Sequence, residues 1–126
     1  MADEHQHVEL VKGISKQFKS ILDDSEQAIY IYLDDIHKVC NARFATMLGY
    51  SSPEEWAQVE TPFETFVDPG SMETLSSAYY KAMQKLVPSK INVTWKKKPA
   101  GTVATSVVLV PIVFNDTLFA LHFVAQ

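Results

Sequence analysis

Few side chains in this 126-residue sequence have the types and spacing that catalysis or metal binding requires. The one cysteine, Cys40, stands directly before Asn41 in a largely apolar stretch, where a small buried hydrophobic residue is the ordinary role of a thiol. His37 and His122 have no cysteine, histidine or carboxylate at a metal-ligand spacing. We therefore interpret His122 as a hydrogen-bonded strand residue and predict no metal site.

Two groups of charged residues are also better explained by structure than by chemistry. Asp34 and Asp35 are adjacent, so on a turn their carboxylates point apart and do not form an acid–base pair. The three lysines at residues 96–98 suggest an anion site, but they alternate in direction at the end of a predicted strand. Lysines there discourage pairing with another sheet, so we expect a solvated edge. The sequence thus predicts no catalytic residues.

Composition limits the class of protein further. A hydrophobic content of 47% in a chain of this length suits one ordinary core. The net charge of -4 repels a phosphate backbone, which argues against a nucleic-acid partner. No apolar run approaches the roughly 20 residues that span a bilayer, and the N-terminus has no signal-peptide core. With one cysteine and no internal disulfide, we predict a cytoplasmic protein that does not enter a membrane.

The first 25 residues have the pattern of an amphipathic helix. From Val8 to Leu22, apolar residues gather on one side of a helical wheel and charged residues on the other. The apolar stripe is wider than a coiled-coil seam, so it can contact its own sheet and a second molecule together. We predict that residues 1–25 form a flanking helix and that the chain is a homodimer. The predicted dimer interface is Val8, Val11, Ile14, Phe18, Ile21 and Leu22.

Residues 26–126 are predicted to form one domain. Capping signals at Asn41, at Ser52-Pro53 and at Asp68-Pro69 start two short helices and one longer helix that ends near Leu86. Tight turns are expected at residues 98–101 and 115–116. Strands are expected at residues 28–33, 37–40, 91–95, 103–114 and 118–125. Strands joined by tight turns are antiparallel, so this order indicates an α+β fold whose helical insert crosses one face of the sheet.

At this point the sequence resembles the PAS family of sensory domains. The resemblance begins with IYIYLDDIHKVCNARFATMLGYSSPEEW, which has a strand, an acidic turn, a strand, an Asn-capped helix and Gly-Tyr-Ser in that order. It continues with FVDPGS, and ends with WKKKPAGT and VLVPIVFNDTLFALHFVA, which are similar to the last three strands. The resemblance covers about residues 26–125. It implies a PAS-like (profilin-like) five-stranded antiparallel sheet with short helices on one face, and it likens the first helix to the flanking helix through which many PAS domains dimerise.

The resemblance also bears on cofactors, because PAS domains sense light, oxygen, redox state or metabolites according to what their cavity holds. The flavin photoreceptor pattern G-x-N-C-R-F-L-Q is absent, and the nearest segment is LGYSSPEEW. Haem-binding relatives generally carry an axial histidine on the long helix, whereas SMETLSSAYYKAMQKL contains none. We predict neither haem nor flavin, and we leave open an unknown small apolar or aromatic ligand.

Alternation along the strands, combined with the resemblance, predicts which residues line a cavity between helices and sheet. The predicted cavity residues are Ile31, Phe44, Met47, Tyr79, Met83, Val93, Trp95, Leu109, Leu121 and Phe123, with Tyr79 as the polar group. Ile29, Leu33, Val107 and Phe119 are expected on the same face. The opposite face is predicted to carry Tyr30, Tyr32, Val108, Val110, Ala120 and Val124 under the first helix. The same residues also fit a filled core that binds nothing.

Three functions follow from these patterns. The leading one is a sensory or signalling module that binds a small ligand or a protein partner and transmits a packing change through its first helix and dimer interface to an unidentified signalling protein. The second is a small α+β cavity enzyme of isomerase or hydratase type, which needs a carboxylate or histidine in the cavity. The third is a redox or gas sensor that carries flavin or haem despite the missing motifs.

Overall fold

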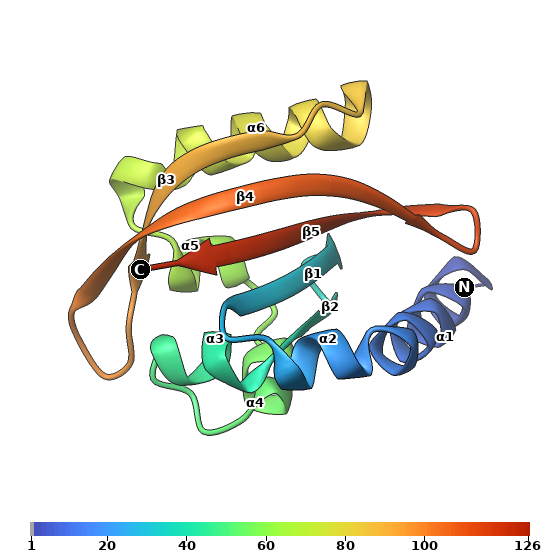
Figure 1. The fold of residues 1–126 in the computed structure, drawn as a ribbon, viewed down its shortest axis with the longest axis horizontal. Helices are drawn as coiled ribbons and strands as arrows, with labels where there is room; N and C mark the ends of the chain where they lie inside the picture. Colours follow the sequence, from blue (N-terminus) through green and yellow to red (C-terminus); the bar gives the residue numbers. More distant parts are fainter. Residues whose placement is uncertain (1) are drawn as a thin grey trace.

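The chain folds around one five-stranded sheet, shown in Figure 1, a computed structural model that describes the backbone of residues 2–126 and the side chains of residues 8–126. All neighbouring strands are antiparallel, in the order β2-β1-β5-β4-β3. The strands are β1 (Ala28–Asp34), β2 (His37–Cys40), β3 (Ser89–Lys96), β4 (Thr102–Phe114) and β5 (Thr117–Ala125). This arrangement confirms the predicted α+β architecture.

The helices divide into an N-terminal pair and an insert between β2 and β3. The N-terminal pair is α1 (Ala2–Gln17) and α2 (Lys19–Asp24). The insert contains α3 (Ala42–Met47), α4 (Pro53–Ala57), α5 (Pro62–Phe66), the 3-10 turn η1 (Pro69–Ser71) and α6 (Met72–Lys85). None of the helices between residues 2 and 126 has the length and apolar content needed to cross a membrane. Helix α5 was not predicted from the sequence; it starts with a Thr-Pro pair but has no side-chain cap.

Local capping interactions start the helices of the insert. The side chain of Asn41 accepts a hydrogen bond from the Phe44 amide at 3.0 Å, and the Ser52 hydroxyl accepts one from the Glu55 amide at 3.0 Å. The carboxylate of Asp68 accepts one from the Gly70 amide at the start of η1. These caps satisfy amide donors that the first turn of a helix leaves unpaired, and they confirm the predicted starting points.

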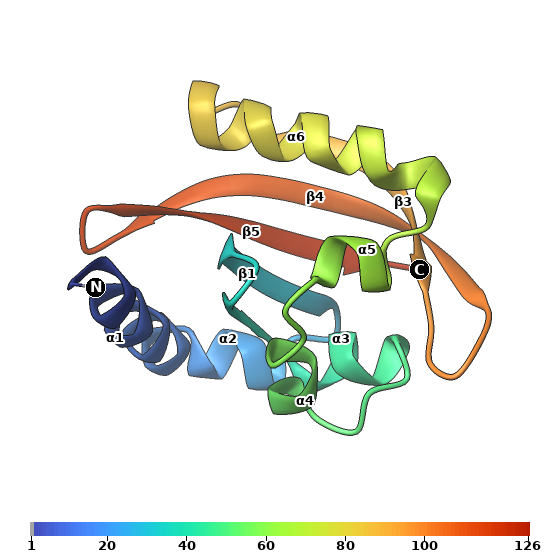
Figure 2. The same ribbon diagram turned by 180° about the vertical axis from the view of Figure 1, so that it is seen from behind.

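The N-terminal helices cover one face of the sheet. Leu10, Ile14 and Leu22 form a buried cluster with Ile29, Ile31, Phe119 and Leu121. In Figures 1 and 2, α1 lies beside the tip of the β4–β5 hairpin. The expected single helix is interrupted at Phe18, although hydrogen bonds from Phe18 to Ile14 and from Leu22 to Phe18 keep the two parts nearly continuous. The predicted cover of this face is confirmed, and its helix begins earlier, at Ala2.

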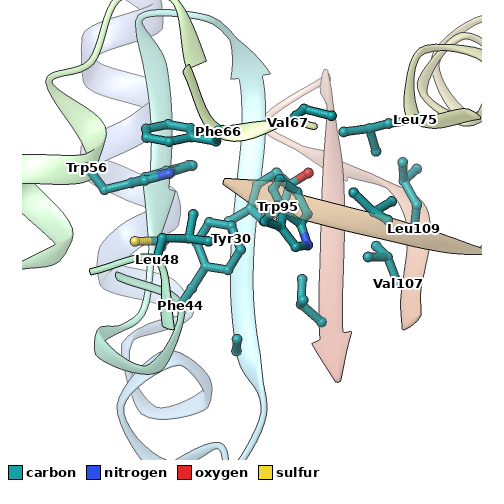
Figure 3. Close-up of a cluster of buried hydrophobic side chains, with 14 of the residues drawn as sticks. Tyr30, Phe44, Leu48, Trp56, Phe66, Val67, Leu75, Trp95, Val107 and Leu109 are labelled. Atoms are coloured by element: carbon teal, nitrogen blue, oxygen red, sulfur yellow. The ribbon is translucent and has the colours of Figure 1, made fainter. Parts of the chain in front are cut away.

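The helical insert covers the other face and encloses the larger part of the core. Figure 3 shows this cluster, in which Phe44, Trp56 and Phe66 from the insert pack against Tyr30 and Trp95 from the sheet. In Figures 1 and 2, α6 lies along β3 and β4. The insert therefore forms one wall of the main core and the sheet the other.

The predicted facing of side chains is correct for β3 and β4 and wrong for β1 and β5. Ile31, Leu121 and Phe123 belong to the cluster under α1 and α2, not to a cavity under the insert. The same holds for the other residues expected with them, Ile29, Leu33 and Phe119. Conversely, Tyr30, Tyr32, Ala120 and Val124 pack in the core under the insert.

Strand pairing explains the error. Directly paired residues of an antiparallel sheet point to the same face. Leu109 pairs with His122, and Val110 pairs with Leu121. Because Leu109 faces the insert, His122 must face it too, and Leu121 must face away. A one-residue error of register reverses every side chain of a strand.

Candidate ligand-binding pocket

A pocket of about 290 Å³ opens between the sheet and the helical insert. Its wall is mostly aromatic, with contributions from β1, β3 and β5 on one side and from α4, α5 and α6 on the other. The lining residues are Tyr30, Tyr32, Asp35, Trp56, Pro62, Phe63, Phe66, Val67, Leu75, Ser76, Tyr79, Trp95 and His122. A concave, largely apolar site with a few polar groups is the usual form of a small-molecule site.

Stacked aromatic rings line this pocket and support its wall. The ring of Tyr30 lies nearly parallel to the imidazole of His122, with centroids 3.8 Å apart, and it also stacks on Phe44 at 4.8 Å. On the insert side, Trp56 stacks on Phe66 at 5.7 Å (Figure 3). These contacts between large rings fix the shape of the wall, because each aromatic pair adds stabilisation beyond the area that it buries.

The two tyrosines near the β1–β2 turn already use their hydroxyls. The Tyr32 hydroxyl donates a hydrogen bond to the carboxylate of Asp35, and the Tyr79 hydroxyl donates one to the carbonyl of Leu33 at 3.1 Å. Burial raises the pKa of both phenols, and the Asp35 carboxylate adds to the effect at Tyr32. Both tyrosines therefore stay neutral, and the hydroxyl of Tyr79, the predicted polar group, is engaged with the backbone.

Lys38 fixes the insert next to the pocket. Its side chain is buried, and its ammonium donates to the carbonyls of Asp35, Ala57 and Val59 and lies 5.4 Å from the centroid of the Trp56 ring. Burial lowers the pKa of this ammonium, while nearby carboxylates oppose the change. The lysine does not line the pocket, so its charge serves the loop after α4 and not a ligand.

His122 is the most unusual group in the wall. It is 2% exposed, and burial lowers its pKa to about 3, an effect that backbone groups of Tyr30 and Ala120 partly offset. The imidazole is therefore neutral near pH 7. Its position on β5 agrees with the prediction of a strand residue. Its Nδ1, however, has no hydrogen-bond partner in the described part of the chain, and the same is true of Trp56 Nε1.

Comparison with known proteins places this geometry in a fold family. No protein-family model matches the sequence. No curated protein matches it. Among solved structures, the PAS domain of a protein from Colwellia psychrerythraea has a TM-score of 0.68 at 22% identity, over 90% of this chain and 96% of that one. A PAS domain from a two-component sensor histidine kinase has a TM-score of 0.66 at 12% identity, over 90% and 96%.

A third match is a light-oxygen-voltage domain studied with a flavin analogue, with a TM-score of 0.58 at 13% identity over 90% of this chain and 83% of that one. The chain has the PAS fold. At such identities the likeness establishes the architecture alone, and the resemblance stated from the sequence is confirmed at that level.

Within the PAS fold, the predicted cavity residues fall into three groups. Tyr79 and Trp95 line the pocket. Phe44, Val93 and Leu109 are buried in the core under the insert, and Met47 and Met83 pack against that core without lining the pocket. Ile31, Leu121 and Phe123 lie on the other face of the sheet.

Several residues that line the pocket were not predicted from the sequence, above all Tyr30, Trp56 and His122. A signal for His122 was present in the turn at residues 115–116, where both residues have positive φ. A two-residue hairpin turn fixes the register of its strands, and this one pairs Phe114 with Thr117 and hence Leu109 with His122. Trp56 gave no such signal, because a single aromatic residue in a short helix does not reveal its direction.

The residues predicted for a dimer interface are only partly available in this PAS fold. Ile14 and Leu22 are buried against the chain's own sheet. Val11 is half-buried, and Phe18 is half-buried against the same cluster. Val8 and Ile21 are exposed, by 37% and 49%. On α1 and α2, only the outer side is therefore free to contact a second subunit.

The residues of this chain are poorly placed to bind a flavin or a metal-containing cofactor. Burial raises the pKa of the Cys40 thiol to about 12, and Cys40 packs in the core without lining the pocket, so it is not placed to react with a flavin. Within residues 8–126, no cluster of three or more histidine, cysteine or acidic side chains could hold a metal ion. His122 is the one imidazole among the pocket-lining residues.

Proposed function

We propose that this chain is a PAS-type sensory module that binds a small apolar or aromatic ligand in the pocket under the helical insert. The observation that supports the proposal best is the pocket itself, since a filled core would leave no opening of about 290 Å³ among seven aromatic side chains. This volume is near the lower end of the range of roughly 300–1,000 Å³ for ligand pockets. The ligand is therefore compact.

The signal in this proposal passes through the sheet to α1 and α2. Tyr30 faces the pocket while its neighbours Ile29 and Ile31 contact the cluster that holds Leu10 and Ile14. A ligand that shifts β1 and β5 thus changes the surface on which the N-terminal helices pack. A ligand shifts such an equilibrium only by its difference in affinity for the two arrangements. The recipients are a second copy of the chain and a downstream signalling protein; a location in the cytoplasm stays a prediction.

Native mass spectrometry of freshly purified protein tests both parts together. We expect the mass of a dimer and a retained small molecule that is lost on denaturation. An apo protein that also fails to bind any member of a library of small aromatic compounds would contradict ligand binding. A monomer at micromolar concentration would contradict the dimer.

Matched surface variants test where the dimer forms. Removing α1 and α2 would expose the apolar cluster beneath them, so substitution is the cleaner test. The double variant Val8→Glu/Ile21→Glu places charge on exposed positions and is expected to sediment as a monomer. The control Tyr80→Glu changes an exposed residue of α6 and is expected to leave the dimer intact. Dissociation by the control and not by the double variant would locate the interface on α6.

An enzyme of isomerase or hydratase type is the second candidate, because His122 and Asp35 both line the pocket. Two observations weigh against it. The pKa of His122, lowered by burial to about 3, makes the imidazole a poor base at neutral pH, since an effective base has a pKa near the working pH. Asp35 is already bonded to the Tyr32 hydroxyl. Turnover of a small carbonyl compound that is lost in His122→Gln would favour the enzyme.

A sensor carrying flavin or haem is the third candidate. The proposal excludes both cofactors, on the sequence motifs and on the position of Cys40 away from the pocket. The absorption spectrum of the purified protein decides the matter, because both cofactors absorb visible light. A colourless protein agrees with the proposal, and a yellow or red one with a matching mass would contradict it.

A further inference from the structure

Two buried polar atoms without partners lie in the wall of the same pocket. Within residues 8–126, Trp56 Nε1 and His122 Nδ1 are the buried side-chain nitrogens or oxygens that lack a hydrogen bond. Both side chains are 2% exposed, and both line the pocket. The coincidence indicates that a bound molecule completes these hydrogen bonds.

The chemistry of the two atoms limits what that molecule is. An indole N–H only donates, so it requires an acceptor. A buried donor left without one costs about 1–3 kcal/mol, and folded proteins rarely leave such groups unpaired. Trp95 supplies the internal comparison, because its Nε1 donates to the Thr105 hydroxyl at 2.8 Å. The fold thus satisfies one of its two indoles internally and leaves the other, in the wall of the pocket, without an acceptor.

The other side chains that line the pocket disfavour an anionic ligand. Asp35 is the carboxylate among the pocket-lining residues, and no lysine or arginine lines the pocket. The nearby ammonium of Lys38 is held by three backbone carbonyls. An anionic ligand would therefore lose its hydration without gaining a counter-ion, and it would approach a carboxylate. The stacked rings of Tyr30 and His122, and of Trp56 and Phe66, favour a flat molecule.

From these observations we infer that the pocket takes a compact, planar, uncharged heteroaromatic compound whose ring acceptor binds Trp56 Nε1. This inference rests on the proposed ligand-binding function and specifies its ligand class. A hydrocarbon of the same shape fills the pocket but leaves the indole N–H unpaired. An aromatic carboxylate supplies acceptors but brings a charge that the wall does not neutralise.

Three probes of nearly equal shape separate these cases: quinoline, naphthalene and 2-naphthoate. Titration calorimetry at pH 7.5 is expected to give quinoline an affinity about tenfold higher than that of naphthalene, the ratio that corresponds to one hydrogen bond of ordinary strength. The affinity of 2-naphthoate is expected to be lower than that of quinoline. In Trp56→Phe, which keeps an aromatic ring and removes the donor, quinoline and naphthalene are expected to bind alike.

Nuclear magnetic resonance of the unaltered protein gives an independent readout. The sequence has two tryptophans, so the spectrum contains two indole N–H signals. Quinoline is expected to move the Trp56 signal downfield and to leave the signal of Trp95, already bonded to Thr105, nearly in place. Naphthalene is expected to move the Trp56 signal much less. This measurement does not depend on whether Trp56→Phe folds.

The possible failures are distinguishable. Equal binding of quinoline and naphthalene, with no selective shift of the Trp56 signal, would overturn the heteroaromatic ligand class and leave ligand binding itself in place. Strongest binding of 2-naphthoate would do the same and indicate an anion site. Binding of none of the three, with retention of a molecule that is charged or not heteroaromatic in native mass spectrometry, would overturn the ligand class alone. Binding of none and retention of nothing would overturn both proposals.

Discussion

The imidazole of His122 and the phenol ring of Tyr30 lie stacked between neighbouring strands, with their centroids 3.8 Å apart and their planes within 10°. The two residues pair directly across β1 and β5. Both are buried, and burial raises the pKa of the phenol and lowers that of the imidazole, so both rings stay neutral at physiological pH. The stack joins the wall of the pocket to the two strands that carry α1 and α2 on their other face.

Protonation of His122 should make the stability of the fold depend on pH. Its pKa is about 3 in the folded chain, against about 6.5 when unfolded, so between these values the unfolded chain binds more protons. The stabilisation from burying a neutral ring is complete above pH 6.5 and is lost as the pH falls toward 3. We expect a loss of about 1.2 kcal/mol between pH 6 and pH 5, measured by urea unfolding.

The control for this prediction is His122→Gln, which removes the titrating group from the same position. Its unfolding free energy should vary less between pH 6 and pH 5 than that of the unaltered protein. Carboxylates contribute below that range, so the comparison is restricted to it. Identical pH dependence in the two proteins would show that His122 does not titrate as its burial implies.

Asn41 is expected to be more important to stability than an ordinary helix cap. Its side-chain oxygen accepts hydrogen bonds from the amides of Phe44 and Ile29, both at 3.0 Å, and its nitrogen donates to the Gln27 carbonyl at 2.9 Å. Asn41→Ala removes the cap and leaves buried backbone groups unpaired, so we expect a loss of about 3 kcal/mol in urea unfolding. Ser52→Ala removes a single cap and should cost about 1 kcal/mol. Equal losses would contradict this ranking.

The starts of the helices could be predicted because their signals are local. Asn41 and Ser52 each cap the helix that follows them in sequence, and no distant residue is needed to read the signal. The hairpin turn at Asn115 and Asp116 could be predicted for the same reason, because both residue types tolerate the positive φ that they have in the structure. The order of strands and helices then followed from these boundaries.

The facing of β1 and β5 could not be predicted from alternation alone. Both faces of the sheet are covered there, so residues 28–33 of β1 are all apolar. Tyr30 is buried under the helical insert, and Ile31 is buried under α1 and α2. Alternation finds the buried face only when the other face is polar, as on β3, where Val93 is buried and Asn92 is exposed. The pairing of β1 with β5, with no hairpin between them, involves residues about 90 positions apart, which no local signal reports. The missed pocket residues Tyr30 and His122 follow from this limit.

Lys38 is expected to hold the segment after α4 in place. Its ammonium donates to the carbonyls of Ala57 and Val59, at 3.0 and 2.6 Å, and to that of Asp35. Lys38→Met keeps the length of the side chain but leaves three carbonyls without this donor, so we expect a loss of about 2–3 kcal/mol. Hydrogen exchange should accelerate in residues 53–59. Lys97→Met, at an exposed position, is the control and should change neither quantity by more than about 0.5 kcal/mol.

A close approach of two backbone segments explains why residue 49 is glycine. Gly49 has a φ of +86°, and a Cβ built on it would lie 2.2 Å from the carbonyl oxygen of Lys98. Lys98 in turn donates its amide to the Leu48 carbonyl at 2.8 Å, so the end of α3 and the β3–β4 loop are held together at this point. Neither partner has room to move away without breaking that hydrogen bond.

Gly49→Ala should therefore cost more than the conformational penalty alone. Gly101 has a similar φ of +94°, but a Cβ there would have no neighbour within 4 Å, so Gly101→Ala measures the backbone term by itself. We expect Gly101→Ala to cost about 1–2 kcal/mol and Gly49→Ala to cost about 3 kcal/mol or more, both by urea unfolding. If the two variants lose the same stability, the approach of Lys98 to Gly49 does not constrain the fold, and the β3–β4 loop is free to separate from α3.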